Sequence, residues 1–158
     1  MSFQKQVNAD PALGVAGQPY GGNPSRYYLP TPLAGDDGVT VGLFVWPVGV
    51  GRVANAGTGA PIGVATREKT VPIPLLENAS MLIPSGLPVS TLQEGEILLA
   101  AATAVTVGQK VFASLTTGKV ATGAAGATVS GHVETIFEVR TAASANDPFI
   151  ASSVTKPA

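Results

Sequence analysis

Residues 38–46 read Gly-Val-Thr-Val-Gly-Leu-Phe-Val-Trp and are followed by Pro47. β-Branched and aromatic residues between a Gly and a Pro are typical of a strand, so we expect one over Val39 to Trp46. Alternation gives it two apolar faces, one with Val39, Val41, Leu43 and Val45 and the other with Phe44 and Trp46. A lone antiparallel sheet normally has one polar face. The pattern therefore predicts a core on one side and a second cover on the other, which another subunit can supply.

The composition points to a protein that associates. The chain has 158 residues, 12% of them charged, with 19 Gly and 13 Pro. Typical domains have about 25% charged residues, and mixed surface charge keeps small domains apart. We therefore expect one β-domain, much of whose surface is buried in an assembly.

Several function classes are disfavoured by the same composition. There is no Cys, which excludes thiol catalysis, zinc–thiolate sites and disulfides. A net charge of -1 without a basic stripe argues against a nucleic-acid partner. The polar start of the chain and the Pro and Gly breaks in its uncharged runs predict neither a signal peptide nor a membrane span.

Residues 1–37 differ from the rest of the chain. They have no sustained periodicity and are interrupted by Pro11, Pro19, Pro24, Pro30 and Pro32. Proline at this density prevents helix and breaks a central strand ladder, so we expect an extended N-terminal arm before a domain of residues 38–158. We expect a partner to order this arm, and residues 2–35 to be removable without unfolding the domain.

Short strand signals with Gly and Pro punctuation fill the rest of the chain. The expected strands are 52–54, 62–66, 70–76, 89–92, 97–107, 105–114, 128–140 and 148–155, with a hairpin loop over 116–119. Helix competes with strand only in the Leu- and Ala-rich run that begins at Ile97. The predicted fold class is all-β, a small β-barrel or β-sandwich of short antiparallel strands with an extended Pro/Gly-rich arm.

Several of these stretches, in this order, resemble the structural cement (capsid decoration) proteins of tailed bacteriophages. They are Asn23-Pro-Ser-Arg26, residues 38–46, Asn55-Ala-Gly-Thr-Gly-Ala-Pro-Ile-Gly63 with Arg67-Glu68, Met81-Leu-Ile-Pro-Ser-Gly-Leu-Pro-Val89 with Glu94-Gly-Glu96, and the 107–120 hairpin. The resemblance implies a virion protein that binds the major capsid protein as homotrimers on the outer capsid surface, near three-fold positions, and reinforces the shell. A receptor-binding or tail-associated β-module of a virion is the alternative.

The resemblance brings no catalytic, cofactor or metal residue, and we expect a protein that is not an enzyme and needs no cofactor. Tyr and Arg are enriched where protein interfaces bind most strongly. The residues we expect at an interface with the capsid protein or another subunit are Tyr20, Arg26, Tyr27, Tyr28, Phe44, Trp46, Arg67 and Glu68. Trp46 can equally be a core residue.

Three other patterns resemble catalytic, metal or nucleotide-binding sites but have simpler structural explanations. Ser130, His132 and Glu134 share one strand parity, but neighbours on that face are about 6.6 Å apart, too far for a relay of short side chains. Asp36-Asp37 is typical of a turn. The glycine pairs at 49/51 and 57/59 lack the third glycine of a dinucleotide fingerprint, so we interpret them as turns.

Overall fold

The computed structural model describes residues 13–21, 23–67 and 81–153, and these form strands and turns without a helix. The six-stranded sheet has the order β1 (Arg26–Tyr27), β8 (Thr91–Glu94), β6 (Gly63–Ala65), β4 (Phe44–Pro47), β5 (Arg52–Ala54) and β2 (Leu33–Ala34). The five-stranded sheet has the order β11 (Val120–Gly123), β10 (Lys110–Ser114), β12 (His132–Val139), β13 (Pro148–Ser152) and β9 (Glu96–Ala100). A third sheet pairs β3 (Val39–Thr40) with β7 (Leu82–Ile83). The all-β prediction is confirmed.

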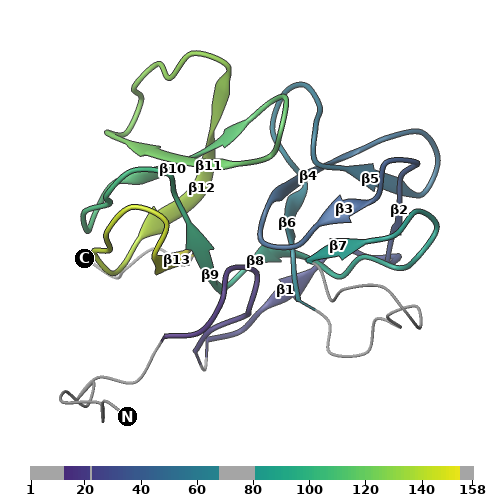
Figure 1. Cartoon of the computed structure of the whole chain (residues 1–158), viewed down its shortest axis with the longest axis horizontal. Coiled ribbons are helices and arrows are strands. Elements are labelled where there is room, and N and C mark those ends of the chain that lie inside the picture. Colours follow the sequence, from purple (N-terminus) through teal and green to yellow (C-terminus); the bar gives the residue numbers. More distant parts are fainter. Residues whose placement is uncertain (1–12, 22, 68–80, 154–158) are drawn as a thin grey trace, which may run out of the picture.

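The sheets form layers around two cores (Figure 1). The larger core combines side chains of the six-stranded sheet with side chains of the five-stranded sheet: Phe44, Trp46, Val64, Leu92, Leu99, Val111, Phe137 and Phe149 are among them. The smaller core lies on the other side of the six-stranded sheet and includes Val39, Val41, Val45, Val53, Ala65 and Ile83. The six-stranded sheet is therefore the middle layer, which explains why its strand β4 is apolar on both faces.

The two large sheets are joined without a loop, and neither is closed. β8 ends at Glu94, Gly95 follows, and β9 begins at Glu96 in the other sheet. An isolated parallel bridge between Ala101 and Val120 joins the two edges of the five-stranded sheet at one point. This sheet therefore curls back toward its own edge and packs on the six-stranded sheet as in a sandwich.

The single strand expected over Val39 to Trp46 is wrong, because the chain bends between β3 and β4. The bend contains Gly42, whose φ is 80°. The side chain of Asn55 holds its two ends: Oδ1 accepts a hydrogen bond from the Thr40 N–H (2.6 Å), and Nδ2 donates to the carbonyls of Thr40 (3.3 Å) and Phe44 (3.1 Å). A side-chain amide thus supplies the partners that a neighbouring strand would otherwise provide.

Two glycine turns pack against β4. Gly57 lies on the Trp46 indole so closely that a Cβ would overlap the ring, while the indole N–H donates to the Gly59 carbonyl at 2.9 Å. Gly118, in the β10–β11 hairpin loop, accepts a hydrogen bond from Phe44 N–H at 3.0 Å. A Cβ on Gly118 would overlap the Phe44 carbonyl oxygen. These turns therefore join the hairpin of one sheet to the central strand of the other.

The described part of the arm is bound by the chain's own strands. Gly17 donates to the Leu98 carbonyl (2.7 Å) and accepts from Arg67 N–H (2.8 Å), so one residue links both large sheets. Farther along, β1 pairs with β8 and β2 pairs in parallel with β5. The arm also covers Leu98, which is fully buried although it lies outside both cores. The described residues of the arm are thus held by contacts within the chain.

Most of the other short strands lie where the sequence predicts them. β5, β6, β8, β10, β12 and β13 fall within or overlap the expected ranges, and the 116–119 loop joins β10 to β11 as a hairpin. The run that begins at Ile97 forms a strand, β9, rather than a helix. The expected strand over 70–76 lies outside the described residues.

Substituting Gly118 tests the contact between the hairpin and β4. Gly118→Ala and Gly126→Ala both place a Cβ on a residue with positive φ, 66° and 72°, which costs about 1–2 kcal/mol. Only Gly118 meets backbone atoms there, whereas Gly126 faces open space. We expect Gly118→Ala to lower the free energy of unfolding by a further ~1–3 kcal/mol, measured by urea denaturation. Equal losses in the two variants would contradict the contact.

Deleting residues 2–35 tests how far the fold depends on the arm. The deletion removes β1, β2 and the bonds of Gly17, and it uncovers Leu98. In place of the sequence-based expectation, we predict loss of the cooperative melting transition in circular dichroism. A deletion of residues 2–12 keeps all these contacts and serves as the control. A cooperative transition in the longer deletion would show that the remaining strands suffice.

Candidate assembly surface

The arm carries the most continuous set of exposed candidate residues. Tyr20 and Tyr27 are each 38% exposed. The backbone of Tyr20 bonds to Glu96 and that of Tyr28 to Thr91, while Arg26 lies opposite Glu94 on β8. These residues therefore follow one another along a continuous edge formed by β8 and β9. The structure thus brings together four of the eight residues predicted from the sequence.

The side chains of Arg26 and Tyr27 project to opposite sides of this edge. The Arg26 guanidinium lies 3.2 Å from the Glu94 carboxylate, and both side chains are about half exposed or more, at 65% and 48%. An ion pair so exposed to water contributes little stability. Neighbouring residues of a strand project to opposite sides. Arg26 lines the opening between the two large sheets, so Tyr27 is presented on the other side of the edge.

Phe44 and Trp46 lie in the interior, which corrects the expectation that they contact a partner. They are 0% and 1% exposed. The Phe44 ring packs edge-on against Phe137 of the other sheet, with centroids 6.0 Å apart and an interplanar angle of 64°. The second cover predicted for this strand is thus provided by the chain itself. The sequence indicates that these side chains are covered, but not by what.

Of the two predicted interface residues Arg67 and Glu68, the structure describes only Arg67. Arg67 is exposed, and its backbone N–H bonds to the arm at Gly17. Glu68 lies outside the described residues. Arg67 is therefore placed next to the arm by its backbone, with its side chain at the surface.

Other exposed apolar side chains lie outside the eight predicted interface residues. Within the described ranges the most exposed are Leu29 (76%), Val50 (101%), Val107 (62%) and Ile136 (57%). Val50 had a signal in the sequence, because it stands between two glycines, Gly49 and Gly51, at the turn between two strands. Ile136 also had a signal, because it shares the strand parity of the polar residues His132 and Glu134.

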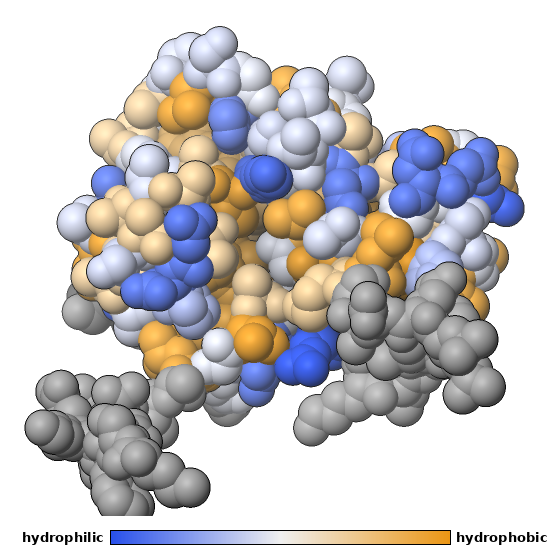
Figure 2. Space-filling model, viewed as in Figure 1, coloured by the Kyte–Doolittle hydropathy of each residue, from blue (hydrophilic) through white to orange (hydrophobic). Residues whose placement is uncertain are grey.

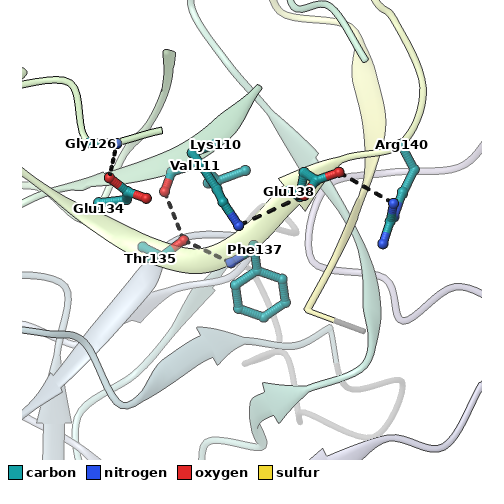
Figure 3. A network of polar contacts seen from close by, with 8 residues as sticks. All are labelled: Lys110, Val111, Gly126, Glu134, Thr135, Phe137, Glu138 and Arg140. Carbon is teal, nitrogen blue, oxygen red and sulfur yellow. Dashed lines mark hydrogen bonds and ion pairs between the residues drawn. The ribbon is translucent and has the colours of Figure 1, made fainter. Parts of the chain in front are cut away.

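Strand β12 contains a bulge that includes Thr135 and Phe137, whose polar contacts are drawn in Figure 3, and Ile136 between them is exposed. Lys110 pairs with Glu138 but Phe112 pairs with Glu134, whereas regular pairing would place Phe112 opposite Ile136. Thr135 stabilises the extra residues: its hydroxyl donates to the Val111 carbonyl (2.8 Å) and accepts from the Phe137 N–H (3.3 Å). Phe137 enters the core and its neighbour Ile136 faces outward, as the alternation of side chains along a strand predicts.

Next to this bulge the edges of the two large sheets enclose an inter-sheet groove. Its volume is about 570 Å³, and it is visible as a recess near the centre of Figure 2. Ile62 and Ile136 are among its apolar lining residues, and Arg26, Glu94 and Glu134 are among the charged ones. The groove has the size of a small-ligand pocket but is open on one side, and it offers apolar surface with charges of both signs.

Ser130, His132 and Glu134 do not form a relay. His132 Nδ1 bonds to the backbone carbonyl of Ser130 at 2.8 Å, and Glu134 Oε2 accepts from the Gly126 N–H at 2.8 Å. Each of these two side chains is therefore engaged with backbone beside it. In the described ranges no group of three or more His, Asp or Glu residues is placed to hold a metal ion. No helix there is long and apolar enough to cross a membrane.

Two comparisons with known proteins both relate the chain to capsid proteins of a bacteriophage. A family model described as XM1 gp53 minor capsid protein matches residues 3–152. A chain in a solved structure titled "The capsid of Myoviridae Phage XM1" has a TM-score of 0.69 and 18% sequence identity, over 97% of this chain and 98% of that chain. No curated protein matches the sequence. At this identity the solved structure supports the fold, and the family model spans nearly the whole chain.

Paired substitutions test the division between surface and core. Arg26→Ala removes only an exposed ion pair, so we expect the free energy of unfolding to change by less than about 1 kcal/mol. Phe44→Ala leaves a cavity between the two large sheets and is expected to cost about 3–5 kcal/mol. Urea denaturation measures both. A loss of several kcal/mol in Arg26→Ala would mean that this residue supports the fold and is not a free surface residue.

Proposed function

This chain belongs to the XM1 gp53 minor capsid protein family, and we propose that within the virion it acts as a capsid cement, or decoration, protein. It is a structural protein of a bacteriophage virion. In the proposed role, homotrimers bind the outer surface of the major capsid protein lattice and stabilise the shell. The binding surface is the exposed side of the arm.

The observation that carries this proposal is the concentration of exposed apolar side chains on the arm. Five of the twelve large apolar residues that are exposed in the described ranges lie within residues 13–29: Leu13, Val15, Tyr20, Tyr27 and Leu29. Exposed apolar side chains grouped along one segment are typical of interaction sites on soluble proteins. Aromatic residues add contact area at a low cost in conformational entropy. The arm therefore has the chemistry expected of a protein-binding surface.

The backbone of the arm makes this surface ready to bind. Tyr20 and Tyr28 are held through their N–H groups by β9 and β8, and Tyr27 pairs with Leu92. A segment that is already ordered loses less conformational entropy on binding, so more of the contact energy appears as affinity. Docking on a capsid then resembles the contact of two rigid surfaces.

The low charge of the chain fits repeated attachment to a lattice. Specific protein interfaces typically bury about 1,200–2,000 Å². When a trimer attaches through three such contacts, the second and third become intramolecular and the attachment strengthens by avidity. Many copies then add resistance to the internal pressure of the DNA without any chemical step.

The proposal predicts that arm substitutions weaken capsid attachment. We expect Tyr27→Ser with Leu29→Ser to reduce occupancy of capsids lacking the protein by roughly tenfold or more at limiting concentration, measured by co-sedimentation. Such particles should also release DNA at a lower temperature than particles saturated with the unchanged chain. Val107→Ser, which alters an exposed apolar residue between β9 and β10, is the matched control.

Two outcomes would contradict this role. Unchanged occupancy in the arm variant would exclude the arm as the attachment surface. A few copies per virion, measured by quantitative mass spectrometry, would favour the tail-associated or receptor-binding alternative, because a capsid lattice takes hundreds of copies.

A further inference from the structure

The turn between β4 and β5 presents an apolar tip that the fold of one chain does not use. We define the tip as Leu33, Val48 and Val50, which are 39%, 46% and 101% exposed. Val48 N–H bonds to the Arg52 carbonyl (2.8 Å), and Leu33 N–H bonds to the Gly51 carbonyl (2.9 Å). The tip is thus held by backbone bonds on both sides. Val50 projects from it, flanked by glycines with φ of 62° and 68°.

The inter-sheet groove offers a complementary surface. Its volume of about 570 Å³ is in the range that holds small ligands, so it has room for a turn with two valine side chains. Ile62 and Ile136 supply apolar contact, and Ile136 is more than half exposed. The tip therefore offers the convex apolar surface that this open groove lacks.

The charges beside the two surfaces match as well. Beside the tip, Arg52 NH1 lies 2.7 Å from Asp36 Oδ1, with side-chain exposures of 44% and 94%. Beside the groove stand Arg26 and Glu94, also exposed and 3.2 Å apart. The tip is flanked by one cation and one anion, whereas the groove is lined by one cation, Arg26, and two anions, Glu94 and Glu134, so Arg52 of one copy can pair with an acidic residue at the groove of another. Figure 2 shows hydrophilic residues next to hydrophobic ones at the end of the molecule where β2 and β5 lie.

We propose that the apolar tip of one copy inserts into the inter-sheet groove of a second copy, with Arg52 facing the partner copy's acidic rim. The tip stands at β4–β5, whereas the groove is lined from β1, β8, β6 and β12, so the contact joins two different surfaces. Contacts of this heterologous kind close into rings, and a cyclic trimer needs one. The inference rests on the homotrimer of the proposed function and identifies the contact that builds it. Tyr27 and Leu29 belong to neither the tip nor the lining of the groove.

Sedimentation equilibrium of the full chain tests the contact. Val50→Asp places a charge in the apolar groove of the partner copy and should raise the trimer dissociation constant by roughly tenfold or more. Val107→Asp adds the same charge at an exposed site outside both surfaces and should leave the constant unchanged. Circular dichroism checks that both variants stay folded, which the full exposure of Val50 favours.

A charge exchange distinguishes pairing across the interface from a general loss of stability. Arg52→Glu and Glu94→Arg should each weaken the trimer, and the double variant should recover most of the loss. If Val50→Asp forms trimers as tightly as the unchanged chain, or if the double variant shows no recovery, this contact is wrong while the cement role stands. If the unchanged chain is monomeric both in solution and on capsids, the homotrimer fails too, and with it this inference.

Discussion

The burial of strand β4 on both faces is the constraint on which the rest of the architecture depends. Phe44 and Trp46 enter the core shared with the five-stranded sheet, while Val45 enters the core beneath β3 and β7. A strand of this kind leaves no face for water, so a layer must cover it on each side. The chain meets this requirement with its own elements, and the six-stranded sheet becomes the middle of three layers.

Close backbone approach makes these layers fit together. Gly57 and Gly118 are needed because a side chain at either position would overlap Trp46 or the Phe44 carbonyl, whatever its chemistry. Asn55 complements them by satisfying backbone groups at the bend between β3 and β4. Buried backbone groups that lacked such partners would cost about 1–3 kcal/mol each. The small and polar residues of the 55–59 turn thus have a packing explanation, with no need for a phosphate or a cofactor.

In this fold, the exposed apolar surface that can bind other proteins lies at the edges of the sheets and at turns. The arm completes both large sheets and turns outward the apolar groups that its own strands do not cover. Val50 at the β4–β5 turn and Ile136 on the outward side of β12 are exposed as well. In a chain with 12% charged residues, such exposed groups favour association, and a capsid lattice offers many equivalent partners. The proposed attachment and trimer contacts both follow from this arrangement.

The sequence by itself determined the all-β class and most of the short strands, because alternation and turn residues act within a few positions of one another. The hairpin at 116–119 and strand β12 are local features of this kind. It also indicated that Phe44 and Trp46 are covered and that Tyr20, Arg26, Tyr27 and Tyr28 belong together. Only the tertiary structure decided that the chain itself covers Phe44 and Trp46, because periodicity reports burial and not the identity of the covering group. The same holds for the arm, whose Gly17 bonds to Leu98: no local pattern encodes a partner so distant in the sequence.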